Sequence, residues 1–333
     1  MSSTDVNPIH RINELYWGFA ISRAIHVAAK LGLADHVHPS GTPVSLIAQQ
    51  AGLNEDRLYR LMRLLASYQI FAETDKGVFI PTALSDVLQS GVDGTVRHAA
   101  HLVTRSMWEA YGELEHTIET GQDTYTALFG KGVFEYLDEH AHEGEQFSRA
   151  MDNYAELENP VIAGCCPLQD TTSVVDVGGG QGGFITAVLQ QNPHLVGMLF
   201  DQPQVIAGLG DTATDETSVV RVSGSFFDKV PMGADVYFLK RILHDWSDED
   251  CCKILQTVKA AMAPESRLYV IDAIVPEGNV PHFSKDLEAF LMTWGGQERD
   301  LAEFERLFQQ VGLKLVSVTE TGTALSLLEV KLA

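Results

Sequence analysis

The chain of 333 residues contains little cysteine, and its four cysteines form two adjacent pairs, Cys165-Cys166 and Cys251-Cys252. Neither pair has the C-x-x-C spacing of a zinc or redox site. Neighbouring cysteines rarely bond to each other without strain. We therefore expect unpaired thiols in a reducing compartment, and neither a disulfide framework nor a metal site.

Positive charge is also scarce, because 23 Lys and Arg face 45 Asp and Glu, for a formal net charge of -22. Such acidity disfavours nucleic acid and anionic membranes as partners. Roughly 18 uncharged apolar residues in a row are needed to span a bilayer, and no such run is present. The first residues also lack a basic region followed by an apolar one. The expected location is the cytoplasm.

What the chain does contain is enough apolar sequence for two domains. Hydrophobic residues make up 45% of the composition, which suits a globular protein with a substantial core. The acidic residues are unevenly spread. Residues 1–100 hold 8 Lys and Arg against 9 Asp and Glu, whereas the remaining residues hold 15 against 36. A near-neutral module therefore precedes a strongly acidic one.

The near-neutral module has a winged-helix pattern. Apolar residues recur at helical spacing over 9–35, two helices are expected over 44–70 around a turn at Gly52, and residues 71–81 alternate as in a hairpin. DNA binding is one function of this pattern, and a dimerisation or substrate-lid module is the other. Because the module is not basic, we favour the second.

Residues 97–160 are predicted to be helical, with aromatic residues and methionine at helical spacing that suit a core or the wall of a pocket for a flat ligand. From residue 172 short β-rich segments alternate with helices, which predicts a parallel α/β sheet. The expected organisation is a winged-helix-like domain over 1–96, a helical connector over 97–165 and a catalytic α/β domain over 166–333. The expected strands are Ser173–Val177, Leu195–Phe200, Val219–Val222, Asp235–Leu239, Arg267–Ile271, Lys314–Val318 and Ala324–Val330.

A glycine-rich turn follows the first of these strands, in Asp176-Val-Gly178-Gly-Gly180-Gln-Gly182-Gly183. Glycines let a backbone turn tightly and approach a ligand. The spacing also satisfies the dinucleotide pattern G-x-G-x-x-G, so the turn alone is ambiguous. Asp201 ends the next strand, where a carboxylate accepts ribose hydroxyls. Asp176 suits a cationic ligand and would repel the pyrophosphate of NAD, so we favour a nucleoside with a positive charge.

Asp176-x-Gly178-x-Gly180-x-Gly182 resembles the first motif of class I S-adenosylmethionine (SAM)-dependent methyltransferases. Two later segments, 239–248 and 295–300, resemble signatures of the caffeate, hydroxyindole and bacterial antibiotic O-methyltransferase family. The resemblance covers nearly the whole chain. It implies a Rossmann-like SAM-binding domain preceded by a mostly helical winged-helix dimerisation domain, a homodimer, and a small aromatic acceptor that carries a hydroxyl.

His244 is the candidate general base. A phenol has a pKa near ~10 and needs deprotonation, for which a histidine with a pKa near ~6.5 is suitable. Among 12 histidines, His244 follows a predicted strand at the sheet edge where α/β proteins bind ligands. Ser247 and Asp250 resemble a capping box that would fix this loop. The alternative is a structural histidine of the loop.

The resemblance places two further acids beside His244, namely Asp272 and Glu298. The family pattern more often has glutamate at the first position, so the shorter aspartate puts its direct contact with His244 in doubt. Trp246 is expected either to pack on adenine or to belong to the core. The resemblance implies cofactor contacts at Gly178, Gly180, Gln202, Ser225, Phe226, Phe227, Lys240 and Arg241, and an acceptor pocket lined by Trp108, Phe147, Met151, Met292 and Trp294, without a metal.

Three alternatives stay open at the level of sequence. An NAD-dependent oxidoreductase would explain the glycines and Asp201 but leaves His244 and Glu298 without a role. A winged-helix transcription regulator conflicts with the acidic balance. A SAM-binding family member that performs hydroxylation or decarboxylation is the third, and the presence of His244 favours methyl transfer over it.

Overall fold

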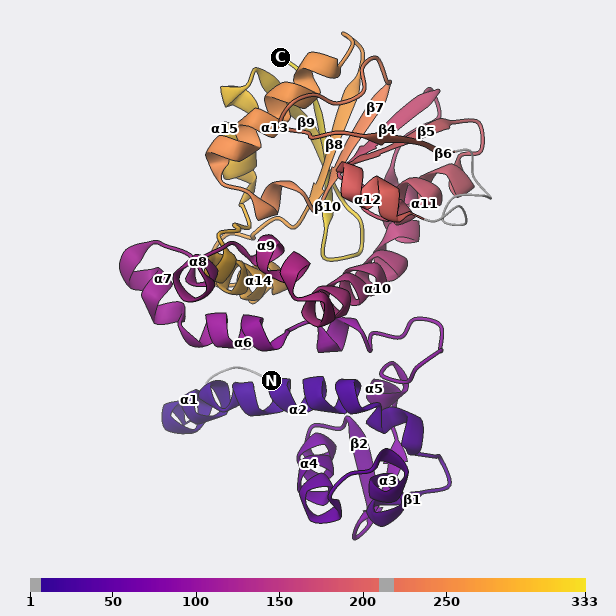
Figure 1. Cartoon of the computed structure of the whole chain (residues 1–333), viewed down its shortest axis with the longest axis vertical. Coiled ribbons are helices and arrows are strands. Elements are labelled where there is room, and N and C mark those ends of the chain that lie inside the picture. Colours follow the sequence, from indigo (N-terminus) through magenta and orange to yellow (C-terminus); the bar gives the residue numbers. More distant parts are fainter. Residues whose placement is uncertain (1–6, 210–218) are drawn as a thin grey trace. The chain divides into compact units, whose positions relative to one another are not determined.

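The structure is a computed structural model that describes residues 7–209 and 219–333. The chain forms two compact units (Figure 1). Unit 1 comprises the chain up to Arg105 together with Ala141–Tyr154, and unit 2 comprises Ser106–His140 together with Ala155–Ala333. The helical segment expected as a connector over 97–165 is thus divided between the two units.

Unit 1 has the predicted winged-helix fold. Asn54 begins the second of its paired helices, accepting a hydrogen bond from the Arg57 N–H, as a helix N-cap does. A small three-stranded antiparallel sheet supplies the wing, and Ile47, Met62 and Phe71 lie in its core. The elements are α1 (Pro8–Tyr16), α2 (Gly18–Leu31), η1 (Leu33–His36), β1 (Thr42–Pro43), α3 (Val44–Ala51), α4 (Glu55–Ser67), β2 (Phe71–Asp75), β3 (Val78–Pro81), α5 (Ala83–Asp86) and η2 (Ala99–His101).

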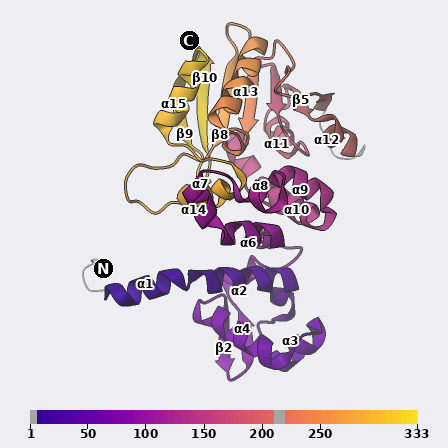
Figure 2. The same ribbon diagram turned by 60° about the vertical axis from the view of Figure 1, so that its left-hand side comes forward.

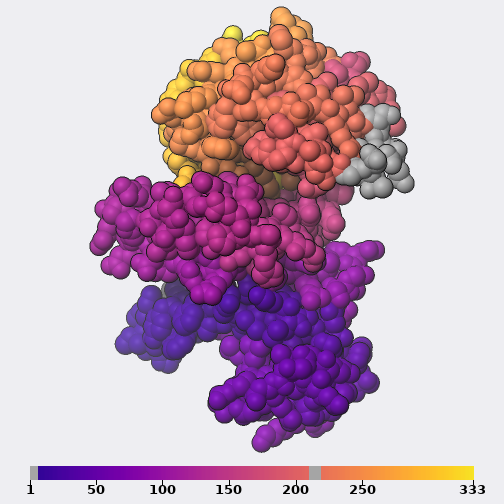
Figure 3. All heavy atoms as spheres, in the orientation of Figure 1, coloured from indigo at the N-terminus to yellow at the C-terminus, as the bar shows by residue number. Residues whose placement is uncertain are grey.

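The single helix expected over 9–35 is broken at Trp17 into α1 and α2. Helix α1 buries none of its residues. Ile12, Leu15 and Phe19 are each more than half exposed, and the N-terminal helices, coloured indigo, lie at the surface in Figure 3. A contiguous apolar surface of this kind marks an interaction site.

Unit 2 is built on a seven-stranded sheet in the order β6-β5-β4-β7-β8-β10-β9 (Figure 1). Its strands are β4 (Ser173–Val177), β5 (Val196–Asp201), β6 (Val219–Ser223), β7 (Val236–Lys240), β8 (Arg267–Asp272), β9 (Leu313–Glu320) and β10 (Ser326–Leu332). All seven predicted strands are present. The first five are parallel, but β10 runs antiparallel to both β8 and β9. The expectation of a parallel sheet is wrong for this pair, because the short turn between them forms a hairpin and not a crossover.

Helices pack on both faces of this sheet (Figures 1 and 2). Along β4, Val174 belongs to one core cluster and Val175 to the other, since successive side chains of a strand point to opposite faces. The helices on the sheet are α11 (Gly183–Gln191), α12 (Pro203–Gly208), α13 (Asp248–Ala261) and α15 (Leu301–Gln310). Helix α14 (Phe283–Leu291) lies beside α8 (Thr124–Phe129) and contacts the 3-10 turn η4 (Met292–Trp294), and a second such turn is η3 (Leu243–Asp245). Burial on both faces explains why the central strands β4, β7 and β8 are mostly apolar.

The middle of the chain is helical, as predicted. Its helices are α6 (Arg105–Gly112), α7 (Leu114–Thr120), α8 (Thr124–Phe129), α9 (Val133–Glu139) and α10 (Ala141–Cys165). Helix α10 runs five residues beyond the predicted end at residue 160. In the part of the chain that the structure describes, no helix combines the length and the apolar character that crossing a bilayer requires.

Candidate active site

Five parallel strands end at one edge of the sheet of unit 2, and the predicted site residues follow those ends. Gly178 comes after β4, Ser225 after β6 and His244 after β7, while Asp201 and Asp272 are the last residues of β5 and β8. Parallel strands expose loops and helix N-termini at their carboxyl ends, where open α/β sheets bind ligands. The topology therefore brings residues from 176 to 298 to one place.

The glycine-rich turn after β4 depends on its glycines. Gly178 has a φ of 74°, and a Cβ there would lie 2.5 Å from Cδ1 of Ile242. Gly180 also has a positive φ, of 58°, but nothing lies within 4 Å of the position of its Cβ. The backbone around Gly180 is therefore open to a ligand, whereas Gly178 is required by close packing.

Asp176 lies beneath this turn and is 1% exposed. Its Oδ2 has no hydrogen-bond partner among the described residues. Burial raises the pKa of the Asp176 carboxyl to about 7, against the opposing charge of Lys240. A buried acceptor without a partner is uncommon, and a cationic group bound at the turn would supply the missing partner.

Asp201 connects the turn to the end of β5. Its Oδ2 accepts a hydrogen bond from the Gly180 N–H at 2.8 Å, and its Oδ1 accepts one from the Gln202 N–H at 2.6 Å. Each carboxylate oxygen has a second lone pair, so Asp201 retains the capacity to accept ribose hydroxyls. Gln202 is exposed at the start of α12, and its predicted cofactor contact stays a prediction.

The loop after β6 forms an aromatic cluster. Ser225 Oγ accepts a hydrogen bond from the Phe227 N–H at 3.2 Å. The Trp246 ring meets the rings of Phe226 and Phe227 nearly edge to face, with centroids 5.9 and 4.8 Å apart. Such contacts are stabilising and belong to the larger core cluster of unit 2. Core packing of Trp246 is therefore observed, and its contact with adenine stays a prediction.

Lys240 ends β7 and Arg241 follows it, beside an acid that the sequence did not reveal. The Arg241 guanidinium donates to both carboxylate oxygens of Glu158 in α10, at 2.8 and 3.0 Å, and Lys240 Nζ lies 3.9 Å from Glu158 Oε2. Burial and the neighbouring Arg241 lower the pKa of Lys240 to about 8. Arg241 is also one of only two non-glycine residues with positive φ in the described chain, so this ion pair holds a strained backbone three residues before His244.

His244 lies in η3 and is 8% exposed. Its Nδ1 lies 3.1 Å from Glu298 Oε1 and 3.9 Å from Asp272 Oδ1, and its Nε2 lies 3.6 Å from Asp245 Oδ1. We assign the Nδ1 proton to the hydrogen bond with Glu298, because a carboxylate only accepts. Nε2 is then the nitrogen that can take a proton from a substrate.

Three acids govern the protonation of His244. Burial lowers the pKa of the imidazole, but the carboxylates of Asp245, Asp272 and Glu298 outweigh burial and raise it to about 9. An imidazolium is therefore favoured when the site holds no other cation. A positively charged ligand nearby would lower this pKa again.

Asp272 reaches His244 less closely than Glu298 does. It is fully buried, and neither of its carboxyl oxygens has a hydrogen-bond partner among the described residues. Burial raises its pKa to about 7. The distance of 3.9 Å from His244 is too long for a hydrogen bond, in keeping with a side chain one methylene shorter than glutamate.

Two neighbouring loops fix the position of His244. Ser247 begins α13 and accepts a hydrogen bond from the Asp250 N–H, as its sequence predicts. The other loop carries Glu298 and is fixed by Arg299, which the sequence analysis did not single out although it follows Glu298 directly. Arg299 is 1% exposed and donates to backbone carbonyls of the segment that carries His244.

The residues expected to bind the acceptor lie in both units. Trp108 in α6 and Met292 and Trp294 in η4 belong to unit 2. There the ring of Phe290 lies 5.8 Å from that of Tyr111 and 5.2 Å from that of Trp294, so an aromatic wall is present. Phe147 and Met151 lie on the part of α10 that belongs to unit 1, and their place in an acceptor site stays a prediction. No group of His, Cys, Asp and Glu in the described residues is arranged to hold a metal ion.

The fold and this edge of the sheet define a Rossmann-like nucleoside-binding enzyme. Residues 111–314 match the family model of the O-methyltransferase domain, and residues 13–91 match that of the O-methyltransferase dimerisation domain. The phenazine O-methyltransferase PhzM of Lysobacter antibioticus is 32% identical over 322 residues, which cover 96% of this chain and 94% of that protein.

Two solved structures are also similar. A methyltransferase of calicheamicin biosynthesis, solved in its S-adenosylhomocysteine-bound form, is 33% identical with a TM-score of 0.88 and covers 99% of this chain and 100% of its own. An O-methyltransferase from neocarzinostatin biosynthesis was solved in complex with SAM and 2-hydroxy-5-methyl naphthoic acid. It is 29% identical with a TM-score of 0.80, and the match covers 94% of this chain and 96% of that one. The chain belongs to the O-methyltransferase family. It is a SAM-dependent enzyme, and the comparisons do not favour an oxidoreductase or a regulator.

Proposed function

We propose that the chain methylates a hydroxyl of a small aromatic acceptor, with His244 as the general base. SAM supplies the methyl group and its sulfonium is a good leaving group, so the protein must bind, align and deprotonate the acceptor. The observation that carries the proposal is His244 with Nδ1 on Glu298 and Nε2 left for a proton. One relative is a phenazine O-methyltransferase and one similar structure holds a hydroxynaphthoic acid, and both support a flat phenolic acceptor.

The residues of the glycine-rich turn fit this cofactor. Asp176 offers a buried acceptor without a partner to a cationic donor, and the open backbone at Gly180 permits close approach. In this proposal Asp176, Asp201 and Ser225 bind the cofactor. Incubating the enzyme with SAM and a panel of phenols, and measuring methylated product by mass spectrometry, tests the function. Methylation of amines alone, or of no acceptor while SAM binds, would contradict it.

Glu298 and Asp272 are expected to contribute unequally. Glu298→Gln removes the carboxylate that contacts His244 at 3.1 Å and should lower kcat roughly 10-fold or more, because the imidazolium loses a charge-assisted hydrogen bond. Asp272→Asn removes a carboxyl that makes no hydrogen bond with His244 and should lower kcat less. Steady-state kinetics of the two isosteric variants measure the difference. A larger loss in Asp272→Asn would reverse the two roles.

The reaction should become faster as the pH rises. Because the acidic neighbours raise the pKa of His244, to about 9 without a bound cation, the neutral base is the minor form at neutral pH, and kcat/KM for the acceptor should increase as the pH rises above 7. The Asp245 carboxylate contributes to the raised pKa, so Asp245→Asn should shift the rising limb to lower pH. A pH profile of both enzymes measures the shift, and a profile that moves to higher pH would contradict the assignment.

The homodimer that the family model implies is assigned to α1 and the start of α2. Leu15 and Phe19 are 55% and 59% exposed, and replacing both with Glu should produce a monomer in light scattering because the apolar contact is lost. Leu46→Glu, on an exposed apolar residue of α3, is the control that should stay dimeric. A wild-type monomer would rule out the assignment.

A further inference from the structure

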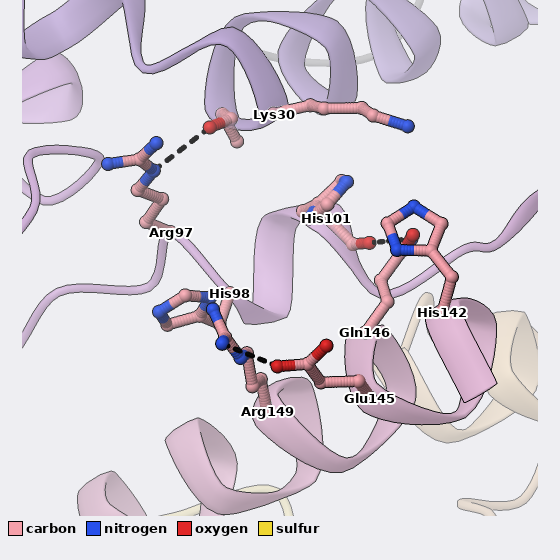
Figure 4. A pocket seen from close by; sticks show the side chains of 9 residues that line it. Lys30, Arg97, His98, His101, His142, Glu145, Gln146 and Arg149 are labelled. Carbon is pink, nitrogen blue, oxygen red and sulfur yellow. Dashed lines mark hydrogen bonds and ion pairs between the residues drawn. The ribbon is translucent and has the colours of Figure 1, made fainter.

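A concave site lies entirely within unit 1, and none of the residues that line it is among the predicted site residues (Figure 4). Its volume is about 200 Å³, and it lies between the end of α2, the segment around η2 and the first turns of α10. This basic pocket is lined by Lys30, Arg97, His98, His101, His142 and Arg149, with Glu145 as the one acid. Such a cluster contrasts with a chain whose net charge is -22.

Two of the cations are already paired. Arg97 Nη1 contacts Asp35 Oδ2 at 2.9 Å, and Arg149 Nη2 contacts Glu145 Oε1 at 2.6 Å. Lys30, His98 and His142 have no acidic partner among the described residues. The positive charge of the pocket is therefore only partly compensated within unit 1.

The charges around the pocket affect the protonation of His101. Its Nε2 is buried without a hydrogen-bond partner, and its ring lies 4.9 Å from that of His26. Burial and the charges of Lys30, His98 and Arg97 lower the pKa of His101 to about 4. A further positive charge is thus disfavoured here, and the contribution of the neighbouring cations favours an anion.

We propose that the basic pocket binds a small oxyanion with two negative charges, such as a phosphate group. A ligand of this charge would neutralise Lys30, which lies with His101 and His142 on one side of the pocket in Figure 4. The volume is below the ~300–1,000 Å³ of pockets for drug-sized ligands, which favours a small ion. Charge-assisted hydrogen bonds are the strong contacts for such an ion.

Isothermal titration with inorganic phosphate in chloride buffer tests the proposal. We expect saturable binding with a Kd of about 1 mM or tighter, weakened roughly 10-fold or more in Lys30→Gln and in His101→Gln. Arg60→Gln, which removes an equal charge from exposed α4, should bind like the wild type. Titration with malonate shows whether a dicarboxylate binds as tightly as phosphate, and acetate is the monovalent comparison. Absence of saturation, or equal weakening in Arg60→Gln, would overturn the proposal, and so would acetate binding as tightly as phosphate.

A separate observation concerns Arg299 of unit 2, the largest of the fully buried side chains. Its guanidinium donates to the carbonyl of Leu243 at 2.8 Å and to that of Trp246 at 2.9 Å, so it holds the chain on both sides of His244. The same group contacts Asp248 Oδ1 at 2.8 Å. A planar fork with several fixed donors is suited to bridging carbonyls in this way.

The backbone strengthens this clamp. The Gln297 N–H donates to the His244 carbonyl at 2.8 Å. A Cβ on Gly296 would lie 2.8 Å from the same carbonyl oxygen, so only glycine permits the approach. The loop that carries Glu298 is thereby fixed against the turn that carries His244.

We infer that Arg299 is a positioning residue that sets the contact between Glu298 and Nδ1 of His244. The inference rests on the proposed role of His244 as the base. Lysine at position 299 keeps the charge but has no fork, so it can bridge fewer of the carbonyls. A shift of about 1 Å in a catalytic group can cost on the order of 10²-fold in rate.

Arg299→Lys should lower kcat on the order of 10- to 100-fold with KM for the acceptor and Kd for SAM nearly unchanged. The matched control is Arg267→Lys, because Arg267 also bridges polar groups, at 2.9 Å from the Pro167 carbonyl, but at the opposite end of β8. This variant should lose thermal stability and keep its kcat. If Arg299→Lys loses only stability while His244→Ala is inactive, the positioning role fails alone; if His244→Ala stays active, the proposed function itself fails.

Discussion

Replacing His244 with Ala is expected to lower kcat by roughly 10²–10⁴-fold, the usual contribution of a general base. The reason is the geometry around the imidazole, which places Nδ1 3.1 Å from Glu298 and leaves Nε2 for the acceptor proton. The affinity for SAM should be nearly unchanged, because Asp176, Asp201 and Ser225, to which the binding of the cofactor is assigned, lie at the ends of other strands. Product formation under saturating SAM and acceptor measures kcat, and isothermal titration measures the affinity.

His194→Ala is the matched control for this variant, since His194 is an exposed histidine of the same unit outside the predicted site. It should retain full activity. An acceptor with a low hydroxyl pKa ionises without help, so the loss in His244→Ala should grow as the pKa of the phenol increases across a substrate series. Equal activity of His244→Ala and wild type for a phenol of pKa near ~10 would remove the base from the mechanism.

Much of the fold could be predicted because local pattern and burial agree. The central strands β4, β7 and β8 are mostly apolar and buried, being covered on both faces, and the alternation of strands with helices predicts parallel order. The antiparallel hairpin of β9 and β10 was not predicted. Its strand signals resemble those of the others, and only the short turn from residue 321 to 325 distinguishes a hairpin from a crossover.

The site could be predicted where motif and strand end coincide, as at Gly178, Asp201 and His244. Glu158 could not, because its contact with Arg241 joins residues 83 positions apart and no local pattern predicts such a pairing. Arg299 follows Glu298 directly, which hinted at a role in the site. Its hydrogen bonds to the turn that carries His244 join residues far apart in sequence, so no local pattern predicts them. Sequence therefore identifies the residues that face a ligand better than those that hold them.

Asp201 offers the second large effect. Replacing it with Ala should weaken SAM binding roughly 10²–10⁴-fold, because hydrogen bonds from two ribose hydroxyls to a carboxylate contribute ~1.5–3 kcal/mol each. The variant also removes the acceptor of the Gly180 N–H at 2.8 Å, so the glycine-rich turn loses a support. Titration with SAM, S-adenosylhomocysteine and NAD measures the effect, and we expect no NAD binding in either protein.

Asp201→Asn separates the two contributions. An amide oxygen can still accept from the Gly180 N–H, but it lacks the charge and the second acceptor oxygen that the ribose requires, so its affinity for SAM should lie between those of Asp201→Ala and wild type. Asp170→Ala, an exposed acid just before β4 and thus at the opposite edge of the sheet, should bind SAM normally. If Asp201→Asn binds SAM as tightly as wild type while Asp201→Ala does not, the carboxylate supports the turn and does not bind the ribose. If Asp201→Ala bound SAM as tightly as wild type, Asp201 would not bind the ribose, and another residue at this edge of the sheet would have to accept its hydroxyls.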